Sequence, residues 1–260
     1  MSSGGAKSAA KTITAAVVVI GDEILSGRTK DQNIGFIADH LTAIGIQLRE
    51  VRIVGDVEAE IVEAVNALRA AYSYVFTTGG IGPTHDDITA DSIAAAFGVG
   101  IDIDERAVEQ MRARYDEAML TESRLRMARI PHGAQLVDNN ISMTPGFMLE
   151  NVIVMAGVPA IMQVMLDAVT PHLECGARML SRTIRVMVAE GDVAPGLTAV
   201  QGQFDDVAMG SYPFFEMGRL GTNLVLRSTD PDRLEHALKA LLARLQKDGF
   251  LDHILIEEGA

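Results

Sequence analysis

Short β-branched segments alternate with segments of helical periodicity along most of the chain. Residues 14–20 form a run of β-branched and small apolar residues that ends at a glycine, and residues 74–78 form a similar run. Residues 33–43 and 57–72 instead carry apolar side chains at three- and four-residue spacing. Strands that are buried on both faces of a parallel sheet are continuously apolar and are joined by helices. The alternation therefore predicts an α/β fold with a three-layer, mostly parallel sheet.

The pattern changes near residues 174–181, where a shorter βαββα order begins that is typical of a small α+β domain. The sequence predicts a flexible tail at residues 1–12, an α/β domain at 13–176 and a second, smaller α+β domain at 180–254. Within them, the spacing also predicts helical segments at 89–97, 104–129, 159–173, 197–205 and 230–245, and strands at 134–137, 146–149, 152–155, 182–190, 208–215 and 222–228.

The composition excludes several classes of protein. The 260-residue chain is 48% hydrophobic, yet it holds no apolar run of about 18 residues, which a membrane-spanning helix needs. Cys175 is the single cysteine, so no internal disulfide forms and a reducing cytoplasm is expected. The net charge of −13 argues against nucleic acid or an anionic membrane as a partner. An anionic ligand would have to be held by backbone N–H groups, a helix N-terminus or a bridging metal ion.

The strongest candidate site is the loop at residues 77–89, Thr-Thr-Gly-Gly-Ile-Gly-Pro-Thr-His-Asp-Asp-Ile-Thr, between a predicted strand and a predicted helix. Three glycines in four positions let the main chain approach a ligand and adopt positive φ. The amides at the start of the following helix suit a phosphate. The alternative interpretation is a tight turn in which Asp87 caps that helix.

Two further loops carry carboxylates after predicted strands. Asp22 and Glu23 follow the first strand, and Asp56 follows the second. Carboxylate oxygens suit Mg²⁺, which commonly bridges a protein to phosphates. The alternatives are a solvated acidic loop for Asp22 and Glu23, and a cap of the helix that starts at Val57 for Asp56.

Several of these segments together resemble the molybdopterin-binding (MoaB/Mog-like) superfamily. They are Gly-Asp-Glu-Ile-Leu-Ser-Gly at 21–27, the loop at 77–89, and the Thr-Pro-Gly-Phe and Gly-Val-Pro sequences at 144–147 and 157–159. More closely, they are similar to the N-terminal part of the competence/damage-inducible protein A (CinA) family and its stand-alone relatives. The resemblance spans residues 13–174, and the small domain resembles the one that follows in those relatives.

The resemblance implies an adenylated, pyrophosphate-containing or pterin ligand on residues 79–87. Asp87 matches the catalytic aspartate of the family's loop, and Asp56 matches the acidic residue after the second strand. Two departures stand out: Met155-Ala-Gly157 replaces the usual Leu-Pro-Gly, and Ile81 stands where the pterin branch usually has threonine. The second departure favours the CinA-like branch.

Two functions follow as hypotheses. The first is a hydrolase of nucleotide pyrophosphates such as ADP-ribose or FAD, in which Asp87 and Asp56 are catalytic. A divalent cation (Mg²⁺, Mn²⁺ or Co²⁺) would be held by Asp87, Asp56, Asp22 and Glu23 and would activate a water. The second is a non-catalytic module that binds molybdopterin or a nucleotide in molybdenum cofactor biosynthesis. The residues expected to contact the ligand are Gly21, Asn33, Thr78, Gly79, Gly80, Gly82, Pro83, Thr84, Thr89 and Gly157.

The predicted partners are a small anionic ligand and further copies of the chain, because members of the superfamily are usually dimers or trimers. A nucleic-acid role is the third and weakest hypothesis. The Gly-Arg-Leu-Gly sequence at 218–221 has the form of an RNA-binding KH loop, but it lies between two predicted strands in an acidic chain. A hairpin turn is the preferred interpretation.

Overall fold

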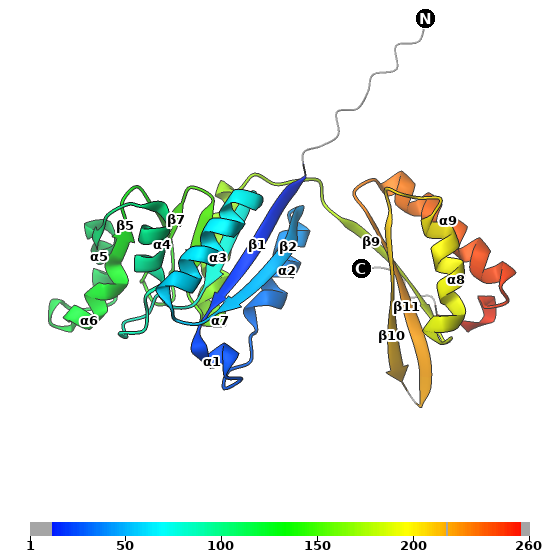
Figure 1. The fold of residues 1–260 in the computed structure, drawn as a ribbon, viewed down its shortest axis with the longest axis horizontal. Helices are drawn as coiled ribbons and strands as arrows, with labels where there is room; N and C mark the ends of the chain where they lie inside the picture. The colour runs from blue at the N-terminus through cyan, green and yellow to red at the C-terminus, as the bar shows by residue number, and fades with distance from the viewer. Residues whose placement is uncertain (1–11, 217, 256–260) are drawn as a thin grey trace, which may run out of the picture. The chain divides into compact units, whose positions relative to one another are not determined.

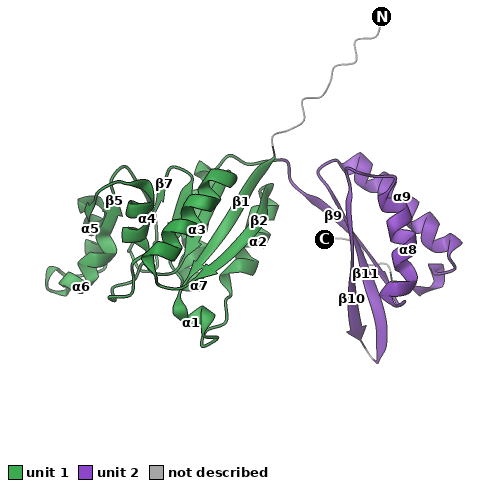
Figure 2. Ribbon diagram, viewed as in Figure 1, with its two compact units in different colours: residues 1–176 green, residues 177–260 purple. Residues whose placement is uncertain are grey.

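The protein is described by a computed structural model that covers residues 12–216 and 218–255, so the predicted tail lies outside the described residues except for Thr12. The chain divides into two compact units between Gly176 and Ala177 (Figure 2). No helix in the described part is long and apolar enough to cross a membrane.

The first unit is built around a six-stranded sheet with the order β2-β1-β3-β8-β7-β6 (Figure 1). The first four strands in that order are mutually parallel, and β7 and β6 are antiparallel to their neighbours. The mostly parallel sheet is thereby confirmed. Its strands are β1 (Ile13–Ile20), β2 (Ile46–Val54), β3 (Tyr74–Thr78), β6 (Gln135–Val137), β7 (Gly146–Leu149) and β8 (Val152–Met155).

Helices cover both faces of this sheet and make three layers. Alternate residues of β1 face opposite sides: Val18 packs in the core on the side of α3 and α4, and Val17 packs in the core on the side of α2 and α7. All of β1 after Thr14 is buried, as its uninterrupted apolar sequence predicts. The covering helices are α2 (Asn33–Ala43), α3 (Glu58–Ala71), α4 (Thr89–Phe97) and α7 (Pro159–Val169), with the short α1 (Asp22–Leu25) at a strand end and the 3₁₀ helix η3 (Thr170–His172) after α7.

The segment between α4 and β6 differs from the continuous helix predicted at residues 104–129. It breaks into short helices and adds a two-stranded antiparallel sheet that periodicity did not predict. The break follows from Asp116 and Thr121, which adopt extended backbone and start new short helices. The elements are β4 (Ile101–Ile103), α5 (Glu105–Arg112), η1 (Glu117–Met119), α6 (Glu122–Leu125), η2 (Arg126–Ala128) and β5 (Arg129–Pro131).

The second unit is a four-stranded antiparallel sheet, order β10-β11-β9-β12, with two helices packed on one face (Figure 1). The βαββα order is confirmed, and a short final strand adds to it. The strand predicted at 182–190 ends earlier, and the helix predicted at 197–205 begins earlier. The elements are β9 (Leu180–Val186), α8 (Glu190–Gln201), β10 (Ala208–Glu216), β11 (Arg219–Ser228), α9 (Pro231–Lys247), η4 (Leu251–His253) and β12 (Ile254–Leu255).

Candidate functional site

The loops that follow the parallel strands of the first unit meet at one edge of the sheet. The Gly21 amide donates to the Val54 carbonyl at 3.1 Å, and the Gly79 amide donates to the Met155 carbonyl at 3.2 Å. A Cβ atom on Gly157 would lie 3.2 Å from the Cα of Gly79, so these two loops are in contact. Ligands of open α/β sheets bind at this edge, which makes it the place to look for a site.

The loop after β3 is built so that only glycine fits. Gly79 has φ +104°, and a Cβ there would lie 2.1 Å from the Ile20 carbonyl oxygen. Gly80 has φ +66°, and a Cβ there would lie 2.2 Å from the Thr89 hydroxyl. Thr89 ties the loop to α4, because its hydroxyl donates to the Gly79 carbonyl at 2.9 Å and its amide donates to the Gly80 carbonyl at 3.0 Å. The expectation of positive φ and close approach is confirmed.

Three consecutive amides in this loop have no acceptor. Within the described residues, the N–H groups of Gly80, Ile81 and Gly82 donate no hydrogen bond. Successive unpaired amides on a glycine-containing turn form a concave set of donors that suits an anion. An anion bound by these amides needs no positively charged side chain from this acidic protein.

Asn33, the first residue of α2, holds the neighbouring loops together. Its side chain is 4% exposed, and its Nδ2 donates to the Thr78 hydroxyl at 2.7 Å and to the Gly157 carbonyl at 2.8 Å. Its Oδ1 and the hydroxyl of Thr77 are buried and without a partner among the described residues. Buried polar atoms are nearly always bonded, so Oδ1 of Asn33 is an acceptor that a donor from a ligand or a water would satisfy.

Asn33 lines an open pocket of about 480 Å³ at this edge. The pocket is bounded by polar and charged residues of the first loop and by the glycines of the two later loops. Its lining includes Glu23, Lys30, Asn33, Thr78, Gly79 and Gly157.

Asp87 closes the second half of the glycine loop. Its Oδ2 accepts the Thr84 amide at 2.8 Å and the Thr84 hydroxyl, and its carboxylate lies against Gly82, where a Cβ would be 2.6 Å away. The alternative interpretation of Asp87 as a helix cap is wrong, because α4 begins at Thr89 behind Ile88 and has no side-chain cap. Asp87 is bonded within its own turn instead.

Asp22 and Asp56 lie next to each other. The Asp22 amide donates to Asp56 Oδ2 at 3.0 Å, and the Asp22 carboxylate lies against Gly55, where a Cβ would be 2.6 Å from its Oδ1. Burial raises the pKa of Asp56, and the charges of Asp22, Glu23 and Asp86 raise it further, against the lowering effect of the Asp22 amide. The alternative in which Asp56 caps α3 is wrong, because that helix begins at Glu58 without a side-chain cap.

The predicted carboxylates do not all gather at one point. Asp87 lines a second pocket, Glu23 lines the Asn33 pocket with its carboxylate folded over Gly21, and Asp56 lines neither. Across residues 12–216 and 218–255, no three His, Cys, Asp or Glu side chains are arranged to hold a metal ion. The residue of the glycine loop whose charge raises the pKa of Asp56 is Asp86. The sequence analysis assigned no role to Asp86.

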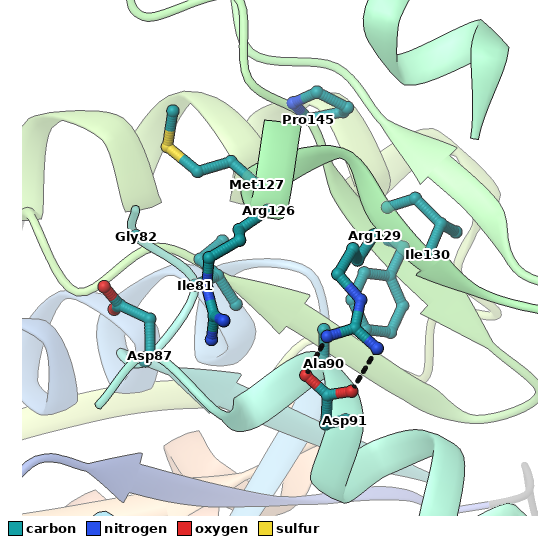
Figure 3. Close-up of a pocket in the computed structure, with 12 residues that line it drawn as sticks. Ile81, Gly82, Asp87, Ala90, Asp91, Arg126, Met127, Arg129, Ile130 and Pro145 are labelled. Atoms are coloured by element: carbon teal, nitrogen blue, oxygen red, sulfur yellow. Dashed lines mark hydrogen bonds and ion pairs between the residues drawn. The ribbon is translucent and has the colours of Figure 1, made fainter. Parts of the chain in front are cut away.

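The second pocket also contains a residue that the sequence did not predict. Arg126 faces the glycine loop from η2 (Figure 3). It lies in a charge-rich stretch with Arg124 and Arg129, and nothing in their spacing distinguishes one from another. Only the folded arrangement brings Arg126 to the glycines of the loop, since it is 44 residues from Gly82 in the sequence.

Comparisons with protein families match both units. Residues 16–174 match the family described as "Probable molybdopterin binding domain", and residues 178–253 match the family described as "FAD synthase, middle domain". The first match covers most of the described part of the first unit.

Individual relatives agree with these families. A protein of Pyrobaculum calidifontis is 32% identical over 246 residues, which is 89% of this chain and 94% of that protein. The "Probable FAD synthase" of Caenorhabditis briggsae is 32% identical over 88% of this chain but only 49% of its own length, so the chain spans about half of that relative. The crystal structure of "CinA with unknown function" from Thermoplasma acidophilum is 36% identical, covers 61% of this chain and 96% of its own, and has a TM-score of 0.58.

Proposed function

This chain belongs to the family of probable molybdopterin binding domains, and we propose that it binds a nucleotide pyrophosphate such as ADP-ribose or FAD and hydrolyses it with the help of a divalent cation. One observation carries the proposal: the amides of Gly80, Ile81 and Gly82 are unpaired among the described residues, on a loop whose positions 79 and 80 accept only glycine. A phosphate held by backbone N–H groups needs no positive side chain, which fits a chain with a net charge of −13.

The Asn33 pocket supports a ligand that also donates a hydrogen bond. Because Nδ2 of Asn33 is committed to two acceptors, its unpaired Oδ1 can only accept. An N–H of a purine, flavin or pterin ring is the type of donor that would satisfy it. The similarity to a relative named as a probable FAD synthase, and to the middle domain of that enzyme, supports a nucleotide as the ligand.

Asp22 and Asp56 are the residues that would hold the cation. Mg²⁺ is commonly bound through one or two carboxylates together with substrate phosphates. The Asp22 amide bonds to the Asp56 carboxylate, and the Asp22 carboxylate lies against the adjacent Gly55, so these two residues could supply such ligands without a complete protein cage. When bound, the ion would neutralise charge that develops on the phosphates. Mn²⁺ and Co²⁺ accept the same oxygen donors.

In the proposed reaction Asp87 takes a proton from water. Both hydrogen bonds that it accepts from Thr84 end on Oδ2, so Oδ1 has no hydrogen-bond partner among the described residues, and the carboxylate lies against Gly82. In the proposed step, the water oxygen forms a bond to one phosphorus and the bond from that phosphorus to the bridging oxygen breaks. The leaving phosphate keeps the electron pair, Asp87 takes the proton, and ADP-ribose yields AMP and ribose 5-phosphate.

A second function, binding of molybdopterin or a nucleotide without turnover, is favoured by a different observation. Asp87 is held within its own turn, and Asp56 is paired with Asp22 outside the pocket that Asp87 lines. A site that only binds a ligand needs the loop amides and Asn33. It does not require the carboxylates of Asp87 and Asp56 to lie in the same pocket.

The test is release of AMP from ADP-ribose and FAD with Mg²⁺, Mn²⁺ or Co²⁺, together with calorimetric binding of the same compounds. Asp87→Asn should lower kcat at least about 100-fold, as expected for loss of a proton-accepting group, and should change Kd little. Asp205→Asn, an exposed aspartate of the second unit, is the matched control and should behave as the unaltered protein. Tight binding with no turnover would replace the hydrolase proposal by the binding module, and no binding would end both.

A further inference from the structure

The sheet of the first unit begins with a long strand whose outer edge pairs with no other strand among the described residues. Strand β2 is first in the order of that sheet, is nine residues long and pairs with β1 alone (Figure 1). A strand at the edge of a sheet presents a row of unpaired N–H and C=O groups. The outer edge of β2 can therefore accept a further strand.

The other sheet edges in the described part of the chain are short or interrupted. At the opposite edge of the same sheet, β6 has three residues, and β4 and β5 of the small two-stranded sheet have three each. In the second unit, β12 has two described residues, and β10 contains Pro213, which has no N–H to donate. Short strands and proline are the usual protection against pairing with another chain. Strand β2 has neither.

The side chains of β2 leave apolar surface exposed at this edge. Val51 is 36% exposed and Ile53 is 41% exposed. They alternate with Glu50 and Arg52, which share the opposite face, where Nε of Arg52 lies 2.8 Å from Oε1 of Glu50. One face of the edge thus carries β-branched apolar residues, and the other carries a pair of opposite charges.

A second copy of the chain would pair with this edge in a restricted set of registers. Two identical strands related by a two-fold axis run antiparallel, and one residue lies opposite itself on the axis. Arg49 is the extra residue of a bulge, because Ala15 pairs with Leu48 and Ala16 pairs with Glu50. Regular pairing is therefore available from residue 50 to the end of β2.

The charges on β2 favour one of these registers. An axis at Glu50 or at Arg52 would place like charges directly opposite each other, and an axis at Ile53 would place Glu50 opposite Asp56 of the other copy. Like charges in these positions are destabilising. An axis at Val51 instead places Glu50 of each copy opposite Arg52 of the other. It also brings the two Val51 side chains together, with Ile53 of each copy diagonal to them.

We propose that the outer edge of β2 binds a second copy of the chain. The two strands run antiparallel with Val51 on the two-fold axis, so the two sheets join into one. Two pairs between Glu50 and Arg52 cross the interface on one face, and the four side chains of Val51 and Ile53 cover one another on the other face. The interface uses no residue that lines the Asn33 pocket, and it does not depend on the proposed function.

The first test exchanges charges and follows the dimer by sedimentation velocity of the full chain over a concentration series. Glu50→Arg and Arg52→Glu each replace two attractive pairs by two repulsive ones, so each should raise the Kd of the dimer at least about tenfold. An equal mixture of the two variants should form a mixed dimer, because position 50 of each chain then faces the opposite charge at position 52 of the other. Neither variant restores the pair within its own chain, so recovery in the mixture reports contact between chains.

Glu122→Arg is the matched control, since it makes the same change of charge at an exposed residue of α6 and should dimerise normally.

The second test locates the axis by cross-linking. In a Cys175→Ser background, which removes the single native cysteine, Val51→Cys should be joined to its own copy by a short thiol cross-linker. Ile53→Cys lies on the same face, but the two copies of residue 53 are offset by four residues, about 14 Å along the strands. It should cross-link at least about tenfold more slowly.

Several results would overturn the inference. They are a monomer at every concentration, a dimer that both charge variants leave intact, a mixture that stays monomeric, and equal cross-linking at positions 51 and 53. If the charge variants do not fold, as judged by their thermal midpoints, the cross-linking pair decides alone. All of these results leave ADP-ribose binding by the first unit untouched.

Discussion

The two units of the chain differ in how they treat buried polar groups. In the second unit, the Thr222 hydroxyl donates to the Val188 carbonyl at 2.9 Å, and Ser228 donates to the Asp206 carbonyl at 3.2 Å. In the first unit, Oδ1 of Asn33 and the hydroxyl of Thr77 are buried and without a partner among the described residues.

This difference indicates which unit binds a ligand. Unsatisfied donors and acceptors destabilise a fold, so they are expected at sites where a ligand completes them. Asn33 lines the pocket at the carboxyl ends of the parallel strands, and Thr77 stands next to Thr78, which also lines that pocket, at the end of β3. The first unit is therefore the expected ligand-binding unit.

The largest expected effect comes from Gly79→Ala. The new methyl group would meet the Ile20 carbonyl at 2.1 Å in a backbone conformation that alanine avoids, so the first unit should lose about 3–5 kcal/mol of stability in urea unfolding. Gly98→Ala has a similar positive φ but open space around the new atom, so it should lose only about 1–2 kcal/mol. Equal losses in the two variants would show that contact with the first strand does not shape the loop.

Asn33→Ala tests whether ligand binding depends on the first unit. It leaves the Thr78 hydroxyl and the Gly157 carbonyl without their donor, which should cost about 2–3 kcal/mol and abolish measurable ADP-ribose binding. Thr222→Val removes a hydrogen bond from the second unit, should cost about 1–2 kcal/mol, and should leave ADP-ribose affinity unchanged. If Thr222→Val impairs ADP-ribose binding as much as Asn33→Ala does, the assignment of binding to the first unit is contradicted.

Asp56→Asn should have the smallest effect, and its sign depends on pH. Because burial raises the pKa of Asp56 in the folded state, the protonated form is favoured by folding, and the stability that it contributes at low pH is lost as pH rises through the folded pKa. The neutral amide should therefore melt slightly higher than aspartate near pH 7, and the gap should close below the ordinary aspartate pKa. A thermal midpoint that is lower at pH 7 than that of the unaltered protein would indicate that the ionised carboxylate stabilises this loop.

Local chemistry explains what the sequence predicts well. The strands at 74–78, 146–149 and 152–155 and the helix at 89–97 coincide with the structure because each is bounded by glycine, proline or a turn residue next to an apolar run. The start of the helix at Pro159 is also confirmed, since proline fits the first helical position.

Where long-range packing decides, the sequence is a poorer guide. Helix α8 begins at Glu190 despite Gly191 and Pro195, because Val193, Leu197 and Val200 together bury one face against the second sheet. Strands β4 and β5 are too short for periodicity, and they form only because residues 101–103 and 129–131 meet. The same holds for Arg126, whose approach to the glycine loop depends on how the segment after α5 breaks and turns.

The central claim is that the amides of Gly80, Ile81 and Gly82 bind the phosphates of a nucleotide pyrophosphate. The most direct measurement is ¹⁵N–¹H correlation NMR of the full chain during a titration with ADP-ribose and Mg²⁺. Saturable shifts of these three amide signals are expected, together with the Asn33 side-chain amide, while signals from β9 and β11 stay in place. Shifts confined to the second unit, or unchanged loop amides at ligand concentrations that saturate binding, would contradict the claim.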